Sequence, residues 1–225
     1  RGHVIATTPD GSCMVGTVTN NSMDFDGGYQ EHPVMWKNGK LVELPNIPTG
    51  RFGYKLSRLI DISADGNVII GGLHYIYPAE IQHYVYYVNE QKAEIIGTDQ
   101  FFSTGSTVTT ACMSTSGEWI AGKARLITPI EGSQFPDEQI IPYRYNTRTK
   151  EFTPYTTSEH HETGATTIFN NGLMAVGTPI ENPYRTLMFF IDGYYYNLEL
   201  ILSERYGIDF MSASGVENSG LAVST

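Results

Sequence analysis

A short pattern recurs along this sequence and constrains the fold more than any other feature. In each copy a small polar residue and a glycine precede an apolar run, as in Asp65-Gly66-Asn67-Val68-Ile69-Ile70-Gly71. The turn glycines of four complete copies and the start of a fifth are Gly11, Gly66, Gly117, Gly172 and Gly220. A regular spacing of about 50 residues is typical of repeat architectures, so the repeat dictates the fold.

Each copy predicts a β-hairpin. Asp-Gly, Ser-Gly and Asn-Gly favour hairpin turns because both residues tolerate a positive φ. The run after each turn is continuously apolar, which predicts a strand covered on both faces. In the four complete copies a second glycine five positions later closes that run and permits a bulge or a close backbone approach. The strands before the turns are expected at residues 3–8, 58–63, 109–114 and 166–169.

Two further strands complete each repeat. The third strands are expected within residues 32–39, 83–90, 142–147 and 187–193, and the fourth within residues 41–44, 93–96, 151–155 and 194–198. Four short strands per repeat indicate a β-propeller blade, and a solenoid is the main alternative because the same stacking produces both. We therefore predict an all-β chain, a β-propeller of four-stranded antiparallel blades, about five in number with the last incomplete.

The chain has no Ser/Thr/Gly linker, which indicates a single β-propeller-like domain over residues 1–225. Its repeats are expected at about 1–53, 54–104, 105–160, 161–206 and, in part, 207–225. The loops between second and third strands vary in length, which maps them to one rim. The only helix is predicted at residues 198–206. A ring must close, so we expect residues beyond 225, or another chain, to complete it. Repeats preceding Arg1 would instead raise the blade count.

Composition excludes several classes of partner. The net charge of -10 disfavours nucleic acid and anionic membranes, since both require a clustered basic face. No apolar stretch approaches the roughly 20 residues that a membrane-spanning helix needs. Cys13 and Cys112 lie in apolar strand patterns of different, non-adjacent repeats, so we expect free thiols in the core.

Histidines give little indication of chemistry. His160-His161 followed by Glu162 is the only histidine cluster, and no local spacing supplies the four converging ligands of a structural zinc site. We interpret these residues as loop residues. His32 and His83 recur at equivalent positions of two repeats, which favours a shared packing role over catalysis.

Acidic and aromatic loop residues supply the remaining candidates. Asp24-Phe25-Asp26 could offer oxygen ligands to calcium, but the spaced third carboxylate and the closing glutamate of an EF-hand are missing. A glycoside hydrolase needs a pair of carboxylates, and tyrosines can stack on sugar rings. The carboxylate candidates are Asp99, Glu131, Asp137 and Glu138, and the stacking candidates are Tyr75 and Tyr77. We expect the carboxylates to be solvated and the tyrosines to fill the core, with no catalytic residue, metal or cofactor.

The repeat resembles the HAF repeats, named for a His-Ala-Phe motif, of bacterial secreted and surface proteins. Ile62-Ser63-Ala64-Asp65-Gly66 with residues 68–71 is similar to the first segment of that repeat. His32-Pro33-Val34-Met35-Trp36 and His83-Tyr84-Val85-Tyr86-Tyr87 are similar to its His-Ala-Phe-x-Trp strand. The third and fourth repeats depart from the motif because they lack the histidine. The resemblance implies an extracellular, cell-surface or periplasmic propeller-like protein and carries over no catalytic residue.

Two functions remain open. Every recurrent residue has a structural explanation, which favours a non-enzymatic propeller that binds a glycan or a surface protein. The alternative is an extracellular carbohydrate-active enzyme, a glycoside hydrolase or lyase, with its site at the central channel, because function resides in sites rather than folds.

Overall fold

A computed structural model describes residues 2–23, 29–48, 55–75, 80–97, 101–102, 111–128, 137–155, 164–177, 187–191 and 194–207. Strands dominate this part of the chain, as predicted. They are β1 (Gly2–Thr7), β2 (Cys13–Met23), β3 (Tyr29–Lys37), β4 (Lys40–Glu43), β5 (Lys55–Ile62), β6 (Val68–Tyr75), β7 (Glu80–Tyr87), β8 (Lys92–Ile95), β9 (Phe101–Phe102), β10 (Ala111–Met113), β11 (Trp119–Thr128), β12 (Asp137–Asn146), β13 (Phe152–Pro154), β14 (Gly164–Ile168), β15 (Met174–Gly177), β16 (Leu187–Ile191) and β17 (Tyr194–Asn197). The predicted helix is α1 (Leu198–Tyr206).

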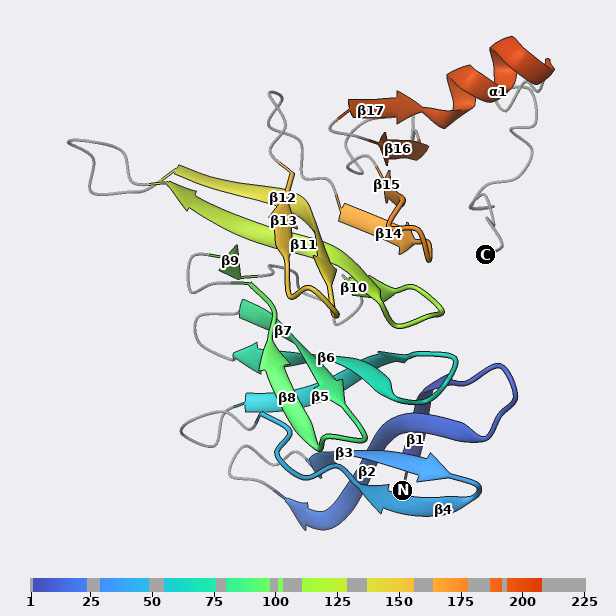
Figure 1. Cartoon of the computed structure of the whole chain (residues 1–225). Coiled ribbons are helices and arrows are strands. Elements are labelled where there is room, and N and C mark those ends of the chain that lie inside the picture. The colour runs from blue at the N-terminus through green and yellow to red at the C-terminus, as the bar shows by residue number, and fades with distance from the viewer. Residues whose placement is uncertain are drawn as a thin grey trace.

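The strands form four antiparallel sheets, each a meander of four consecutive strands. Blade 1 is β1–β4, blade 2 is β5–β8, blade 3 is β10–β13 and blade 4 is β14–β17. Figure 1 shows these blades following one another in chain order, with blade 1 at the bottom and blade 4 at the top. The short strand β9 precedes the expected start of the third repeat yet pairs with β11 of blade 3. The prediction of four-stranded antiparallel blades is therefore confirmed.

The four turn glycines occupy the same place in each blade. Gly11, Gly66, Gly117 and Gly172 join the first strand to the second, with φ of 68°, 72°, 73° and 80°. The residue before each glycine does not share the positive φ, contrary to the dipeptide interpretation. In every blade the glycine N–H instead donates to the carbonyl three residues earlier, at 2.8–2.9 Å. This is the longer hairpin turn in which only one residue must be left-handed.

The fourth turn is one residue shorter than the others. In blades 1–3 the residue three before the glycine donates its N–H to the second residue after it, as Thr8 does to Cys13. In blade 4 Phe169 donates to Leu173, the first residue after Gly172. As a result Val176, and not Gly177, takes the place of Gly16. The sequence alignment of the second glycines is therefore wrong for blade 4.

The second glycine of blade 1 marks a close backbone approach, as expected. Gly16 lies opposite Val4, and a Cβ added to it would lie 1.9 Å from the His3 carbonyl oxygen. The bulge itself lies in the partner strand, between Val4 and Ala6 in β1, and it recurs at the same place in β5 and β14. No side chain larger than hydrogen fits at Gly16.

Three hydrophobic cores lie between successive blades. The core between blades 1 and 2 includes Val15, Met35, Leu59, Ile69 and Tyr86. The next two cores join blade 2 to blade 3 and blade 3 to blade 4 in the same manner. One face of each blade thus packs on the opposite face of the blade that follows it.

A glycine contact accompanies each of these interfaces. A Cβ added to Gly66 would lie 2.9 Å from Cys13 Sγ, one added to Gly117 3.1 Å from Val68 Cβ, and one added to Gly172 2.9 Å from the Trp119 ring. Cys13, Val68 and Trp119 each stand two residues after the turn glycine of their own blade. The turn glycine therefore also lets the preceding blade approach closely.

Candidate functional site

The hairpin turns of the blades gather at one end of the sheets, called the turn rim below. It consists of residues 8–12, 38–39, 63–67, 88–91, 114–118, 146–150 and 169–173. In each of the first three blades a backbone bond joins the two turns, as from Val88 N–H to the Asn67 carbonyl at 2.9 Å. In Figure 1 the first turns of blades 1–3 all project to the right.

A buried hydroxyl organises each of the first three turns. Thr8, Ser63 and Ser114 stand three residues before the turn glycine, and all three are buried. Their oxygens accept hydrogen bonds of 2.9–3.0 Å from the N–H groups of Cys13, Val68 and Trp119. This residue is not among those predicted from the sequence, although its constant spacing from the glycine was a usable signal. Blade 4 has Phe169 at this position and the shorter turn.

The acidic residue before the glycine completes the turn. Asp10 accepts from the Thr8 hydroxyl at 2.7 Å and from Ser12 N–H at 3.0 Å, and these bonds lower the pKa of Asp10 to about 2. Burial opposes the same shift at Asp65, but bonds from Ser63 and Asn67 outweigh it and lower the pKa of Asp65. A carboxylate that accepts such bonds is committed to its own turn.

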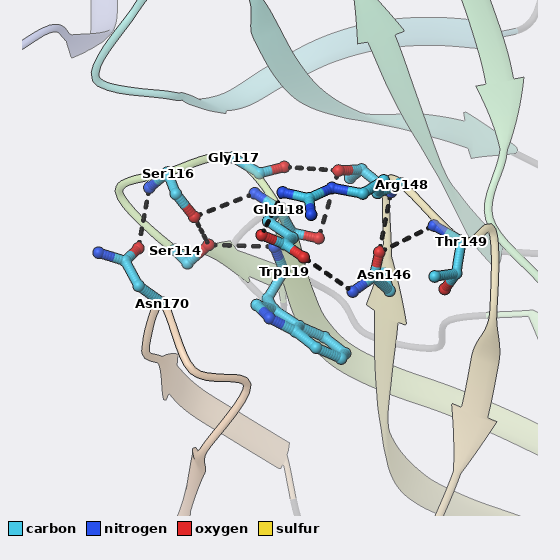
Figure 2. Close-up of polar contacts among 10 residues, drawn as sticks. Ser114, Ser116, Gly117, Glu118, Trp119, Asn146, Arg148, Thr149 and Asn170 are labelled. Carbon is cyan, nitrogen blue, oxygen red and sulfur yellow. Dashed lines mark hydrogen bonds and ion pairs between the residues drawn. The ribbon is translucent and has the colours of Figure 1, made fainter.

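Blade 3 has the most extensive polar network of the turn rim (Figure 2). The buried Asn146 side chain accepts from the N–H groups of Arg148 and Thr149, each at 2.9 Å. The Arg148 guanidinium pairs with the Glu118 carboxylate at 2.9 Å, which ties the second turn of the blade to the first. Asn170 of blade 4 accepts from Ser116 N–H at 2.9 Å, so the network also joins two blades. These polar groups hold the turns together.

A buried polar pair joins blades 2 and 3. His83 of β7 is only 2% exposed, and its Nδ1 lies 2.6 Å from the Tyr143 hydroxyl of β12. Burial holds the pKa of Tyr143 well above its usual value, with a smaller contribution from Cys112. Tyr143 therefore stays a neutral phenol, which suits a structural hydrogen bond.

Asp61 and Cys112 occupy equivalent positions in blades 2 and 3, five residues before the turn glycine. Burial raises the pKa of Asp61, and bonds from the N–H groups of Ile62 and Met113 only partly offset it. Burial, and then the charge of Asp61, raise the pKa of Cys112 to about 12. A nucleophilic cysteine needs a lowered pKa, so the Cys112 thiol has the electrostatics of a packing residue.

Three aromatic rings of blades 2 and 3 are in contact with cationic side chains. The Arg144 guanidinium carbon lies 5.1 Å from the Trp119 ring centre and 5.7 Å from that of Tyr155. Lys150 lies 4.0 Å from the Tyr87 ring centre and pairs with Glu94 at 2.6 Å. Each such contact is worth about 0.5–1 kcal/mol at an exposed site. These rings act as filler between strands and blades.

The prediction that His32 and His83 are equivalent is wrong. His32 lies opposite Val18, seven residues after Gly11, whereas His83 lies opposite Gly72, six residues after Gly66. A shift of one residue turns a side chain to the other face of a sheet. Accordingly, His32 is exposed and His83 is buried. Pro33, opposite Thr17, is the true counterpart of His83.

The other candidates are only partly described. Cys13 and Cys112 are free and lie in blades 1 and 3, as predicted. Asp137, Glu138 and Tyr75 lie on the strands β12 and β6. Outside the described residues lie His160, His161, Glu162, Asp24, Asp26, Asp99, Glu131, Tyr77 and the fifth copy of the repeat. Within the described ranges no three His, Cys, Asp or Glu side chains are grouped to hold a metal ion.

Within the same ranges, no helix combines the length and the apolar character needed to cross a membrane.

Comparison with known sequences finds no matching family model and no matching curated protein. Solved structures do match. A prolyl endopeptidase aligns over 88% of this chain and 28% of its own, with 10% identity and a TM-score of 0.54. An acylaminoacyl peptidase of Pyrococcus horikoshii aligns over 88% of this chain and 32% of its own, with 12% identity and a TM-score of 0.52. Dipeptidyl peptidase 4 of Porphyromonas gingivalis aligns over 85% of this chain and 30% of its own, with 10% identity and a TM-score of 0.51.

The structural neighbours include β-propeller domains of peptidases. At these identities the likeness shows the fold alone, and the four-stranded antiparallel sheets of this chain are consistent with a propeller fold. The chain spans less than a third of the length of these three peptidases.

Proposed function

We propose that this chain is a non-enzymatic β-propeller module that binds a glycan or a protein outside the cell, at its surface or in the periplasm. The observation that carries the proposal is how the buried reactive groups are used. Asp61 and Tyr143 have raised pKa values and lie at the interface of blades 2 and 3. Cys112, whose pKa is also raised, packs against the core between blades 3 and 4. The Cys112 thiol and the Tyr143 phenol are held neutral and used for packing, which suits a rigid scaffold.

The propeller is proposed to contain about five blades. Four are complete, and Ser219-Gly220-Leu221-Ala222-Val223 has the pattern that begins each of the others. Closure of the ring would cover the apolar face that an open end leaves exposed.

The acidic surface supports a glycan or protein as the ligand. The net charge of -10 is unsuited to phosphate backbones. The location outside the cytoplasm is supported by the resemblance of residues 62–71 to the HAF repeats of secreted proteins.

A glycan array with the purified chain, followed by calorimetry on the best glycan, tests this function. We expect saturable binding, and mass spectrometry of the same glycan after long incubation should return its mass unchanged. Two fragments whose summed mass exceeds that of the glycan by one water would instead establish a hydrolase. An unsaturated fragment would establish a lyase. A chain that retains no glycan would restrict the proposal to protein ligands, and failure to bind in a surface-protein array as well would overturn it.

A further inference from the structure

Among the residues that the structure describes, one apolar sheet face has no blade packed against it. We call it the open face: Val4, Met14, Trp36 and Leu41 of blade 1, together with Gly11 at the turn. Register places these side chains on one side of the sheet, since Met14 pairs with Trp36 and Trp36 with Leu41. Val4 and Leu41 are each 55% exposed, which is unusual for large apolar side chains aligned on one sheet.

The same face of blade 2 shows what belongs there. Leu59, Ile69, Tyr86 and Ala93 have the register positions of Val4, Met14, Trp36 and Leu41. These side chains pack against the opposite face of blade 1. The packing of blade 2 on blade 1 therefore indicates that another blade would cover the open face.

The contacts of the turn glycines also indicate that blade 1 lacks a neighbouring blade on this face. Gly66, Gly117 and Gly172 each lie against a side chain two positions after the turn glycine of the preceding blade. Gly11 has no heavy atom of the described residues within 4 Å of an added Cβ. By analogy with the other three turns, the side chain that would contact Gly11 stands two residues after the turn glycine of another blade.

A backbone hydrogen bond between blades 2 and 3 shows which of two neighbouring blades donates and which accepts. Ala64, two residues before Gly66, donates its N–H to the carbonyl of Thr115, two residues before Gly117, at 2.8 Å. The preceding blade supplies the donor and the following blade the acceptor. Pro9 holds this position in blade 1; it has no N–H but keeps the carbonyl. Blade 1 is therefore suited to receive such a bond from a blade that precedes it around the ring.

We propose that the open face is the docking surface for the fifth copy of the repeat, within residues 208–225. That segment carries each required group: Asn218 with an N–H two residues before the glycine, Gly220 itself, and Ala222 two residues after it. The inference rests on ring closure and is independent of any ligand, so a failed glycan test leaves it standing.

Photo-cross-linking of the full chain tests the proposal. The photoreactive amino acid p-benzoylphenylalanine replaces Val4 in one protein and, as the matched control, Ile95, which is 39% exposed on β8 of blade 2. We expect the Val4 probe to join residues 208–225 of its own chain, as read by mass spectrometry of the monomer, and the Ile95 probe not to do so. Cross-links between two chains would mean that a second copy occupies the face. That result, or no cross-link to residues 208–225, overturns the proposal.

Hydrogen exchange provides a second readout that needs no probe. Val4→Glu places a charge on the open face, whereas Ile95→Glu places one elsewhere. We expect Val4→Glu to speed exchange in residues 208–225 at least about tenfold and Ile95→Glu to leave it unchanged. Equal exchange in both variants would contradict docking.

Discussion

Blades 1 and 2 have the same topology and register, yet the same face is exposed in one and sealed in the other. Leu59 of β5 is fully buried, whereas Val4, its counterpart in β1, is 55% exposed. Both lie beside the same bulge and opposite the same glycine position. The burial of a side chain in this fold is therefore set by the blade stacked beside it rather than by its own strand. A neighbouring blade converts a half-exposed sheet face into core.

The largest expected effect follows from substituting leucine on the two faces. Leu59→Ala removes side-chain volume from the core between blades 1 and 2 and should lower the free energy of unfolding by about 2–5 kcal/mol. Leu41→Ala makes the same change on the open face, where Leu41 is 55% exposed, and should lower the free energy of unfolding by less than Leu59→Ala does. Urea denaturation measures both. Equal losses would show that the two faces are equally covered.

A pair of glycines separates backbone strain from contact between blades. Gly117 and Gly39 share a φ of 73°, but an added Cβ meets Ser63 Cβ at 2.8 Å in the first case and nothing within 4 Å in the second. Gly39→Ala should cost about 1–2 kcal/mol through its left-handed backbone. Gly117→Ala should cost a further ~1–3 kcal/mol through overpacking. Identical thermal shifts in the two variants would remove the role assigned to the turn glycine at the interface.

Blades 1 and 2 also differ in the polar pair, because blade 1 has Pro33 where blade 2 has His83, which bonds to Tyr143 of blade 3. Tyr143→Phe deletes the phenol that bonds to His83 Nδ1 and should lower the free energy of unfolding by about 1–2 kcal/mol. Tyr196→Phe, at an exposed position of β17, is the control and should change it by less than about 0.5 kcal/mol. If Tyr143→Phe is as mild as the control, the buried pair does not stabilise the interface.

The smallest change is expected at Asp61, which stands where blade 1 has Ala6. Because burial raises its pKa, Asp61 favours folding when protonated, and the wild type loses that stability as pH rises through the folded-state pKa. Asp61→Asn cannot ionise. Its stability relative to the wild type should therefore increase from pH 4 to pH 7, measured by thermal denaturation at both values. A relative stability that falls over that range would mean that the carboxylate is stabilised in the fold.

The repeat made much of the fold predictable. The turn glycines, the four strands per blade and the helix at residues 198–206 follow from local rules, because a hairpin glycine and an apolar run act over a few residues. The free cysteines followed from the same register. The buried hydroxyls of Thr8, Ser63 and Ser114 were within reach, since their spacing from the glycine is constant.

Other features depended on contacts between distant segments. The sequence aligned His32 with His83 and Gly177 with Gly16, and both alignments are off by one residue, because turn and loop lengths set strand register and a single shift reverses a face. The pairing of His83 with Tyr143 joins residues of two blades, as does the contact of Gly172 with Trp119. Local sequence patterns were enough to predict the four-stranded blade and its recurrence along the chain. Only the tertiary structure decided which face of each blade is covered, because that depends on the blade stacked beside it.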